Sequence, residues 1–103
     1  MNIFGMEFKT KEEREKEMEA YLHRIFPGGE AQKAAVGQEL KEQLPKVDGK
    51  ALLLYYILVK DAMTAQDGMD FEAAVKKVAK KQSVLQATPQ ILEVVRRVME
   101  ENS

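Results

Sequence analysis

The chain of 103 residues has room for one domain and is too short for two ordinary ones. Cysteine is absent, which excludes a disulfide framework and any thiolate metal site. The formal net charge is −1, from 16 Lys and Arg against 17 Asp and Glu, so attraction to nucleic acid or anionic lipid would need a local patch. We therefore predict a single domain over residues 1–103.

Neither a secretory signal nor a membrane span is indicated by the sequence. Its first eight residues lack a basic start and a continuous apolar core. The longest apolar run, residues 51–59, has nine residues, whereas a helix needs about 20 to cross a bilayer core. We expect a soluble, cytoplasmic protein.

The first helix is predicted over residues 10–26. Thr10 and Glu13 have the spacing of a capping box, in which the Thr10 side chain accepts from the Glu13 amide and the Glu13 side chain reaches back. Pro27 and the two glycines after it end the helix, because proline disfavours helical geometry at the preceding residue. The apolar residues between these signals share one helical face: Met18, Tyr21, Leu22, Ile25 and Phe26.

Two further helices are predicted over residues 30–44 and 49–65. The earlier one is lined with alanine, so a neighbouring helix can approach it closely, and Pro45 limits its length. Asp48 is the expected N-cap of the later one, which is apolar on nearly all sides over residues 51–59. A short apolar run could also be a buried strand, but the length and the cap favour a helix. We expect this element at the centre of the fold.

The last two helices are predicted over residues 70–82 and 89–101. Asp70 and Thr88 are the expected N-caps, and Pro89 occupies the first helical position after Thr88. Apolar residues recur at helical spacing in both segments. The predicted fold is therefore all-α, a compact bundle of about five helices with the third helix at its centre.

Residues 1–9 stand apart, because their large apolar side chains alternate rather than follow helical spacing, and we expect an extended N-terminal arm. The arm, six methionines in all and the apolar central helix give more apolar surface than a domain of this size readily covers. We therefore expect a non-catalytic protein–protein interaction or assembly module, whose partner is another protein or a second copy in a homodimer. The alternative is that the arm folds back over its own core.

The predicted contact surface is the arm, or an exposed side of the helices predicted over residues 49–65 and 89–101, and two adjacent tyrosines of the earlier of these helices are among its candidate residues. Tyr55 and Tyr56 point about 100° apart on a helix, so at least one of them should reach the rim, where its hydroxyl can be satisfied. Core packing would also explain both rings. The residues predicted for this surface are Ile3, Phe4, Met6, Phe8, Tyr55 and Tyr56.

A local excess of positive charge distinguishes the last two helices. Between residues 71 and 98, two glutamates stand against six basic side chains: Lys76, Lys77, Lys80, Lys81, Arg96 and Arg97. If these helices formed a helix-turn-helix, the lysines would contact phosphates and residues near Thr88 would enter a major groove. The turn is longer than usual and has no glycine, and lysines opposite an apolar stripe are normally solvated. Nucleic-acid binding is therefore the alternative function, not the preferred one.

Residues 9–19 hold nine charged side chains among eleven. Pairs such as Glu12 with Lys16 stabilise an isolated helix by about 0.2–0.5 kcal/mol each. We favour this structural interpretation of the charged segment. The functional alternative is a helical arm that projects from the domain.

No cofactor, metal or catalytic site is predicted. His23 can share a helical face with Glu15 and Glu19, but a metal site needs further ligands, so we expect a surface histidine. Without cysteine, and with Ser83 and Ser103 as the two serines, the single histidine completes no catalytic triad. Carboxylates on solvated faces keep ordinary pKa values and serve general acid catalysis poorly.

Overall fold

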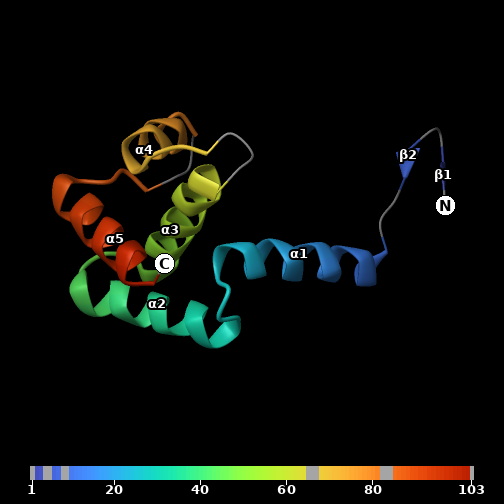
Figure 1. Cartoon of the computed structure of the whole chain (residues 1–103), viewed down its shortest axis with the longest axis horizontal. Coiled ribbons are helices and arrows are strands. Elements are labelled where there is room, and N and C mark those ends of the chain that lie inside the picture. The colour runs from blue at the N-terminus through green and yellow to red at the C-terminus, as the bar shows by residue number, and fades with distance from the viewer. Residues whose placement is uncertain (1, 4–5, 8–9, 65–67, 82–84, 103) are drawn as a thin grey trace.

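The computed structural model describes residues 2–3, 6–7, 10–64, 68–81 and 85–102, with side-chain surroundings from residue 10 onward. Its helices follow the predicted order (Figure 1): α1 Lys11–Ile25, α2 Glu30–Gln43, α3 Gly49–Thr64, α4 Phe71–Ala79 and α5 Pro89–Glu101. The prediction of an all-α bundle of about five helices is confirmed.

Two short strands precede the helices. β1 (Asn2–Ile3) and β2 (Met6–Glu7) pair antiparallel, with Ile3 opposite Met6. In Figure 1 the strand pair lies beyond the end of α1 that is farthest from the other helices.

Local capping determines where most of the helices begin. The side chains predicted as N-caps each accept a bond from a backbone N–H at 2.8–3.3 Å: Thr10 from Glu13, Asp48 from Lys50, Asp70 from Ala73 and Thr88 from Ile91. These bonds satisfy N–H groups that have no partner inside the helix. Helix α2 begins differently, after Gly29 at φ 77°, a left-handed conformation that glycine adopts at little cost.

The helix ends also have local causes. Phe26 leaves the helical region, with φ −124° and ψ 85°, because Pro27 follows it. Helix α4 ends at Ala79, earlier than the approximate prediction of residues 70–82. The N–H groups of Lys80 and Lys81 donate to carbonyls three residues back, so the last turn tightens instead of continuing as α-helix.

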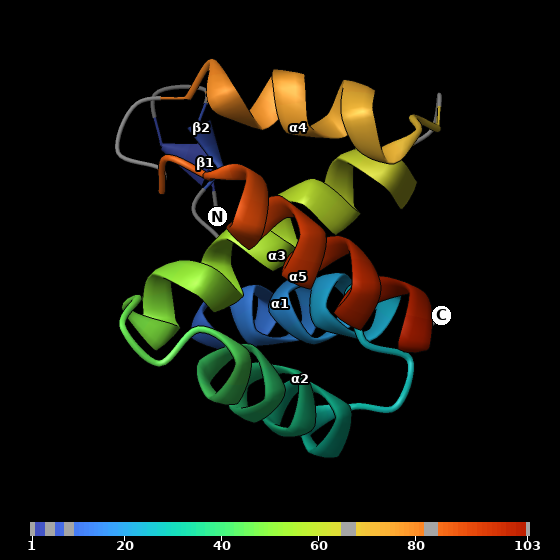
Figure 2. The same ribbon diagram turned by 90° about the vertical axis from the view of Figure 1, so that its left-hand side faces the viewer.

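Helix α3 is the central element, as predicted, and contacts each of the other four helices. Helices α2 and α4 lie on opposite sides of it, and α5 crosses the bundle and packs on both α2 and α3 (Figures 1 and 2). Although α3 is the most apolar helix, it has 16 residues. No helix in the described ranges is long and apolar enough to cross a bilayer.

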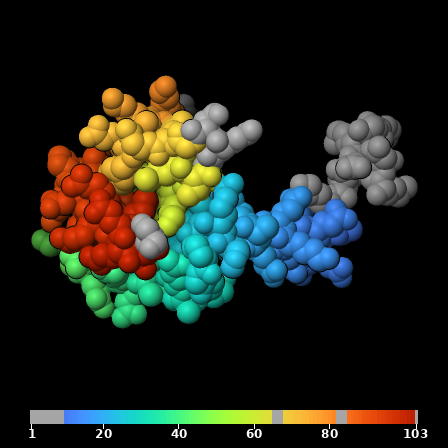
Figure 3. Space-filling model, in the orientation of Figure 1, coloured from blue at the N-terminus to red at the C-terminus, as the bar shows by residue number. Residues whose placement is uncertain are grey.

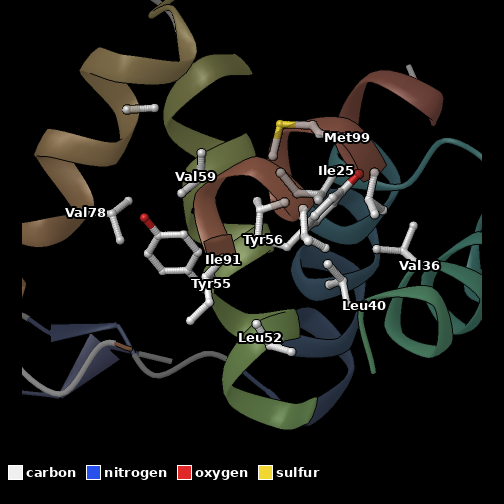
Figure 4. Close-up of a cluster of buried hydrophobic side chains, with 14 of the residues drawn as sticks. Ile25, Val36, Leu40, Leu52, Tyr55, Tyr56, Val59, Val78, Ile91 and Met99 are labelled. Atoms are coloured by element: carbon white, nitrogen blue, oxygen red, sulfur yellow. The ribbon is translucent and has the colours of Figure 1, made fainter. Parts of the chain in front are cut away.

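The core between these helices is apolar, and no charged side chain of the described residues is buried in it. Tyr56 of α3 is fully buried and stacks on Phe26, with ring centroids 5.8 Å apart and planes 4° apart. Large side chains of this kind each stabilise the fold by about 1.5–3 kcal/mol through burial. Figure 4 shows part of the cluster, whose fully buried members include Ile25, Val36, Leu40, Leu52, Val59, Val95 and Val98.

Helix α1 enters this body only at its C-terminal end. Residues 11–20 are all exposed, Tyr21 and Leu22 are half-buried, and Ile25 and Phe26 are buried. The space-filling view shows the outer part of α1 extending away from the other helices (Figure 3). The projecting helical arm, which the sequence left as the alternative, is therefore the arrangement in the structure.

Two sets of polar contacts hold the inner end of α1. Arg24 forms an ion pair with Asp61 of α3, and its guanidinium lies 5.4 Å from the centre of the Tyr21 ring. Gln32 of α2 accepts from the Gly28 N–H at 2.7 Å and donates to the Asn102 carbonyl at 3.1 Å, which ties the loop after α1 to the end of α5. The direction of α1 is thus set by contacts at its base.

Candidate interaction surfaces

Tyr55 and Tyr56 do not form a contact surface in this structure, because they are 2% and 0% exposed. The prediction that at least one of them reaches the rim is wrong. In Figure 4 the ring of Tyr55 lies on the side of Val78 of α4, and that of Tyr56 lies on the side of Ile25. Neighbouring helices therefore cover both rings, and burial raises the pKa of each phenol.

The predicted N-terminal arm is described in part. Ile3 and Met6 are seen as backbone members of β1 and β2, while Phe4 and Phe8 lie outside the described residues. The contact role of these four residues stays a prediction.

The six predicted basic residues are all exposed, but the structure divides them. Lys76 and Arg96 border neighbouring hollows between α4 and α5. Arg97 is directed elsewhere, since it donates to the Gln43 side chain of α2 at 3.0 Å. Lys77 lies on the exposed face of α4, and the remaining two, Lys80 and Lys81, follow its end.

Helices α4 and α5 do not form the helix-turn-helix that the alternative function would use. Both helices pack on α3 more extensively than on each other. The Thr88 hydroxyl, considered for base contacts, accepts a bond from the Ile91 N–H as the N-cap of α5. A helix-turn-helix needs two helices packed directly against each other across a short turn.

The splayed arrangement of α4 and α5 leaves a groove, which we call the α4–α5 groove. Two adjoining hollows of about 330 Å³ and 200 Å³ share Phe71, Glu72 and Leu92. The floor is apolar, formed by half-buried Phe71, Val75 and Leu92. Each wall carries charges of both signs: Glu72 and Lys76 on α4, and Glu93 and Arg96 on α5.

The exposed part of α1, residues 11–20, is the second surface of interest, and we call it the outer half of α1. It carries five glutamates against three basic residues. Met18 stands among these charges with 56% of its surface exposed, the highest value among the large apolar side chains described as exposed. An exposed apolar residue at the middle of a charged helix is a suitable anchor for another molecule.

A third hollow, of about 260 Å³, lies between α1 and α2. Leu22 and Phe26 line it, and its polar residues are Glu19, His23, Glu30 and Lys33. His23 is exposed, as expected. Within the described ranges, no group of three or more His, Asp and Glu side chains is arranged to hold a metal ion.

One carboxyl group, that of Glu39 on α2, has a raised pKa. A side-chain hydrogen bond to Glu101 of α5 raises the pKa of Glu39 on α2, and slight burial and the negative charge of Glu101 raise it further, against the opposing effect of Arg97. Neither carboxyl group lines a hollow described above. The pair therefore belongs to the contact between α2 and α5.

Comparison of the chain with protein-family models, with curated proteins and with solved structures finds no match. The surfaces of the chain itself are therefore the basis for inferring its function.

The α4–α5 groove was not predicted from the sequence, although the three apolar residues of its floor belong to the helical apolar stripes that the sequence shows. Phe71, Val75 and Leu92 belong to stripes that the sequence places in the core. They are half-buried because α4 and α5 diverge over α3, so the outer edges of both stripes remain open. The pattern within one helix carries no information about that angle.

Proposed function

We propose that the protein is a small, non-catalytic helical module for protein–protein interaction, and that α1 is the element it presents to a partner. The observation that carries this proposal is the exposure of the outer half of α1. Isolated helices shorter than about 12–15 residues are marginal in water, even with good helix formers. A capped helix whose residues 11–20 are all exposed gains stability when another molecule packs on it.

The base of α1 supports the same function. Ile25 and Phe26 are anchored in the core, and Arg24 is paired with Asp61. The exposed helix therefore leaves the body in a defined direction, which lowers the entropic cost of binding compared with a disordered segment. A helix with an apolar anchor such as Met18 binds proteins by lying in an apolar groove.

The test uses a tagged chain as bait in extracts of its native cells, with Met18→Lys as the variant and Ala20→Lys as the matched control. Ala20 is exposed and lies about 200° around the helix from Met18, so the control adds the same charge on the opposite face. We expect the original chain and the control to retain the same protein. For the purified pair, Met18→Lys should weaken binding about tenfold or more, as loss of an interface anchor does.

A retained protein that binds all three baits equally would show that α1 is not the contact element. A bait that retains no protein, together with a chain that does not self-associate, would overturn the interaction function.

Nucleic-acid binding is the second candidate, favoured by the exposure of all six basic residues on and beside α4 and α5. If this face binds duplex DNA, Lys76→Glu with Lys80→Glu should lower the affinity and reduce the slope of log K against log salt by about two. Lys46→Glu with Lys50→Glu is the control, because both lysines are exposed elsewhere on the body. Affinity unaffected by the first pair, or no salt-dependent shift of labelled DNA, would remove this candidate.

A further inference from the structure

We infer that a proton shared between Glu39 of α2 and Glu101 of α5 holds the end of α5 in place, and that the attachment of α1 to the body therefore depends on pH. The inference rests on the proposed function, because it concerns the helix presented to a partner, and it adds a means of regulation. It uses neither the α4–α5 groove nor the outer half of α1.

Two hydrogen bonds define how α2 and α5 face each other. Near one end of their contact, Arg97 donates to the Gln43 side chain at 3.0 Å. Near the other end, the Gln32 side chain donates to the Asn102 carbonyl at 3.1 Å. The later residue of α2 is thus bonded to the earlier residue of α5, so the two helices run in opposite directions along this contact.

This antiparallel arrangement brings Glu39 and Glu101 together. Glu39 lies one turn before Gln43 on α2, and Glu101 lies one turn after Arg97 on α5. A hydrogen bond joins the two carboxyl groups. Ionised carboxyl groups are acceptors only, so this bond forms when one of the two holds a proton.

The surroundings of Glu39 favour its protonated form. The hydrogen bond to Glu101, slight burial and the charge of Glu101 raise the pKa of Glu39 from its ordinary value of 4.5. Arg97 lowers this pKa, and Glu42 of the same helix raises it further. Tyr56 faces Glu39 from α3, since the charge of Glu39 affects its phenol. Loss of the proton replaces a hydrogen bond by repulsion between two negative groups.

The end of α5 is the part of the contact that this repulsion affects most. The last turn of α5 contains Glu100 and Glu101 and no basic residue. The C-terminal end of a helix is the negative end of its dipole, so two glutamates there are unfavourable. Helix ends also open at the lowest free energy in a folded protein. The shared proton therefore stabilises a turn that has little other electrostatic support.

Gln32 connects the end of α5 to the base of α1. Asn102 directly follows Glu101, and its carbonyl accepts from the Gln32 side chain. The oxygen of the same side chain accepts from the Gly28 N–H at 2.7 Å, in the loop after α1. When Glu39 loses its proton, the end of α5 should move and weaken both bonds of Gln32.

The first measurement is urea denaturation of the free chain at pH 4.5 and pH 7. In Glu39→Gln the amide donates to Glu101 at both pH values and thus replaces the protonated carboxyl group. The stability from a raised pKa is fully present below the ordinary value of 4.5 and is lost as pH rises through the raised value. We therefore expect similar urea midpoints for Glu39→Gln and the original chain at pH 4.5, and a higher midpoint for the variant at pH 7.

The matched control is Glu100→Gln. It removes a negative charge from the same turn of α5, but Glu100 is not among the groups that raise the pKa of Glu39. Its urea midpoint should change between the two pH values by the same amount as that of the original chain.

Nuclear magnetic resonance tests the connection to α1. The amide signal of Gly28 should move with pH at the midpoint of the Glu39 carboxyl group, and this movement should be absent in Glu39→Gln. Gln32→Ala should leave the titration of Glu39 in place and stop its effect on Gly28, because the connecting side chain is removed. His23 lines a hollow together with Gly29. Any movement caused by His23 is recognised because it persists in Glu39→Gln.

Two outcomes would overturn the inference. A difference in urea midpoint between Glu39→Gln and the original chain that is the same at both pH values would show that no proton is shared. A Gly28 signal that does not follow Glu39 would show that the pair does not act on the attachment of α1. Both measurements use the free chain, so their results do not depend on whether α1 binds a partner.

Discussion

Phe26→Ala is expected to lower the free energy of unfolding by about 3–5 kcal/mol, a large part of the total for a domain of this size. Phe26 is 1% exposed, and its ring stacks on Tyr56 at the point where α1 joins the body. Truncation removes the buried ring and leaves a cavity that the fixed ends of α1 and α2 cannot readily close. The substitution should therefore also loosen the direction of α1.

Chemical denaturation at low protein concentration measures this effect. The control is Leu54→Ala, which shortens an apolar side chain on α3 that is 49% exposed. Surface changes of this kind usually alter stability by no more than about 0.5 kcal/mol. Amide hydrogen exchange at the inner turns of α1 is a second measurement of how firmly Phe26 holds this helix to the body. A loss below about 1 kcal/mol for Phe26→Ala would show that the stacked pair does not anchor α1.

Tyr56→Phe should raise the free energy of unfolding by about 1 kcal/mol, although it removes a polar group from the molecule. The Tyr56 hydroxyl is buried and has no hydrogen-bond partner among the described residues. In water the same hydroxyl is solvated, so the folded state bears the cost of removing that water. Phenylalanine keeps the ring and its stacking on Phe26, and it removes the cost of burying an unbonded hydroxyl.

The same substitution should change the alkaline dependence of stability. Burial, and to a lesser extent the charge of Glu39, raise the pKa of Tyr56 from 10.0 to about 12. Between these values the unfolded chain has lost the phenolic proton and the folded chain still holds it. The stability from this group is thus fully present below pH 10 and is lost as pH rises toward 12. The Tyr56→Phe variant has no phenol at this position and so does not lose this stability. The difference in free energy of unfolding between the variant and the original chain should therefore grow above pH 10.

Denaturation curves at neutral and alkaline pH test both parts. At neutral pH, Tyr55→Phe is the matched control, because Tyr55 is also buried but its hydroxyl is not among the buried polar atoms found without a partner in the described ranges. A Tyr56→Phe variant less stable than the original chain at neutral pH would show that the hydroxyl has a partner in solution.

The sequence predicted some residues of the candidate surfaces, but not how those residues are arranged. The sequence indicated a charged helical segment, six basic residues and an apolar excess, and the structure places the first two on exposed surfaces. Two of the predicted contact residues, Tyr55 and Tyr56, are covered by neighbouring helices, while Met18 and Leu54 are exposed. Side chains on the apolar α3 are equivalent in the sequence pattern, and the pattern does not show which of them a neighbouring helix covers.

The sequence by itself determined where the helices begin and end. Thr10, Asp48, Asp70 and Thr88 cap helices through bonds to nearby amides, and Pro27 stops one through steric contact with the preceding residue. These causes act within a few residues, so they can be read along the chain. The tertiary structure alone decided that α1 projects, that α4 and α5 diverge, and that the two tyrosines are buried. Those features depend on packing between residues distant in the sequence, where the angle between two helices follows from all the side chains at their contact.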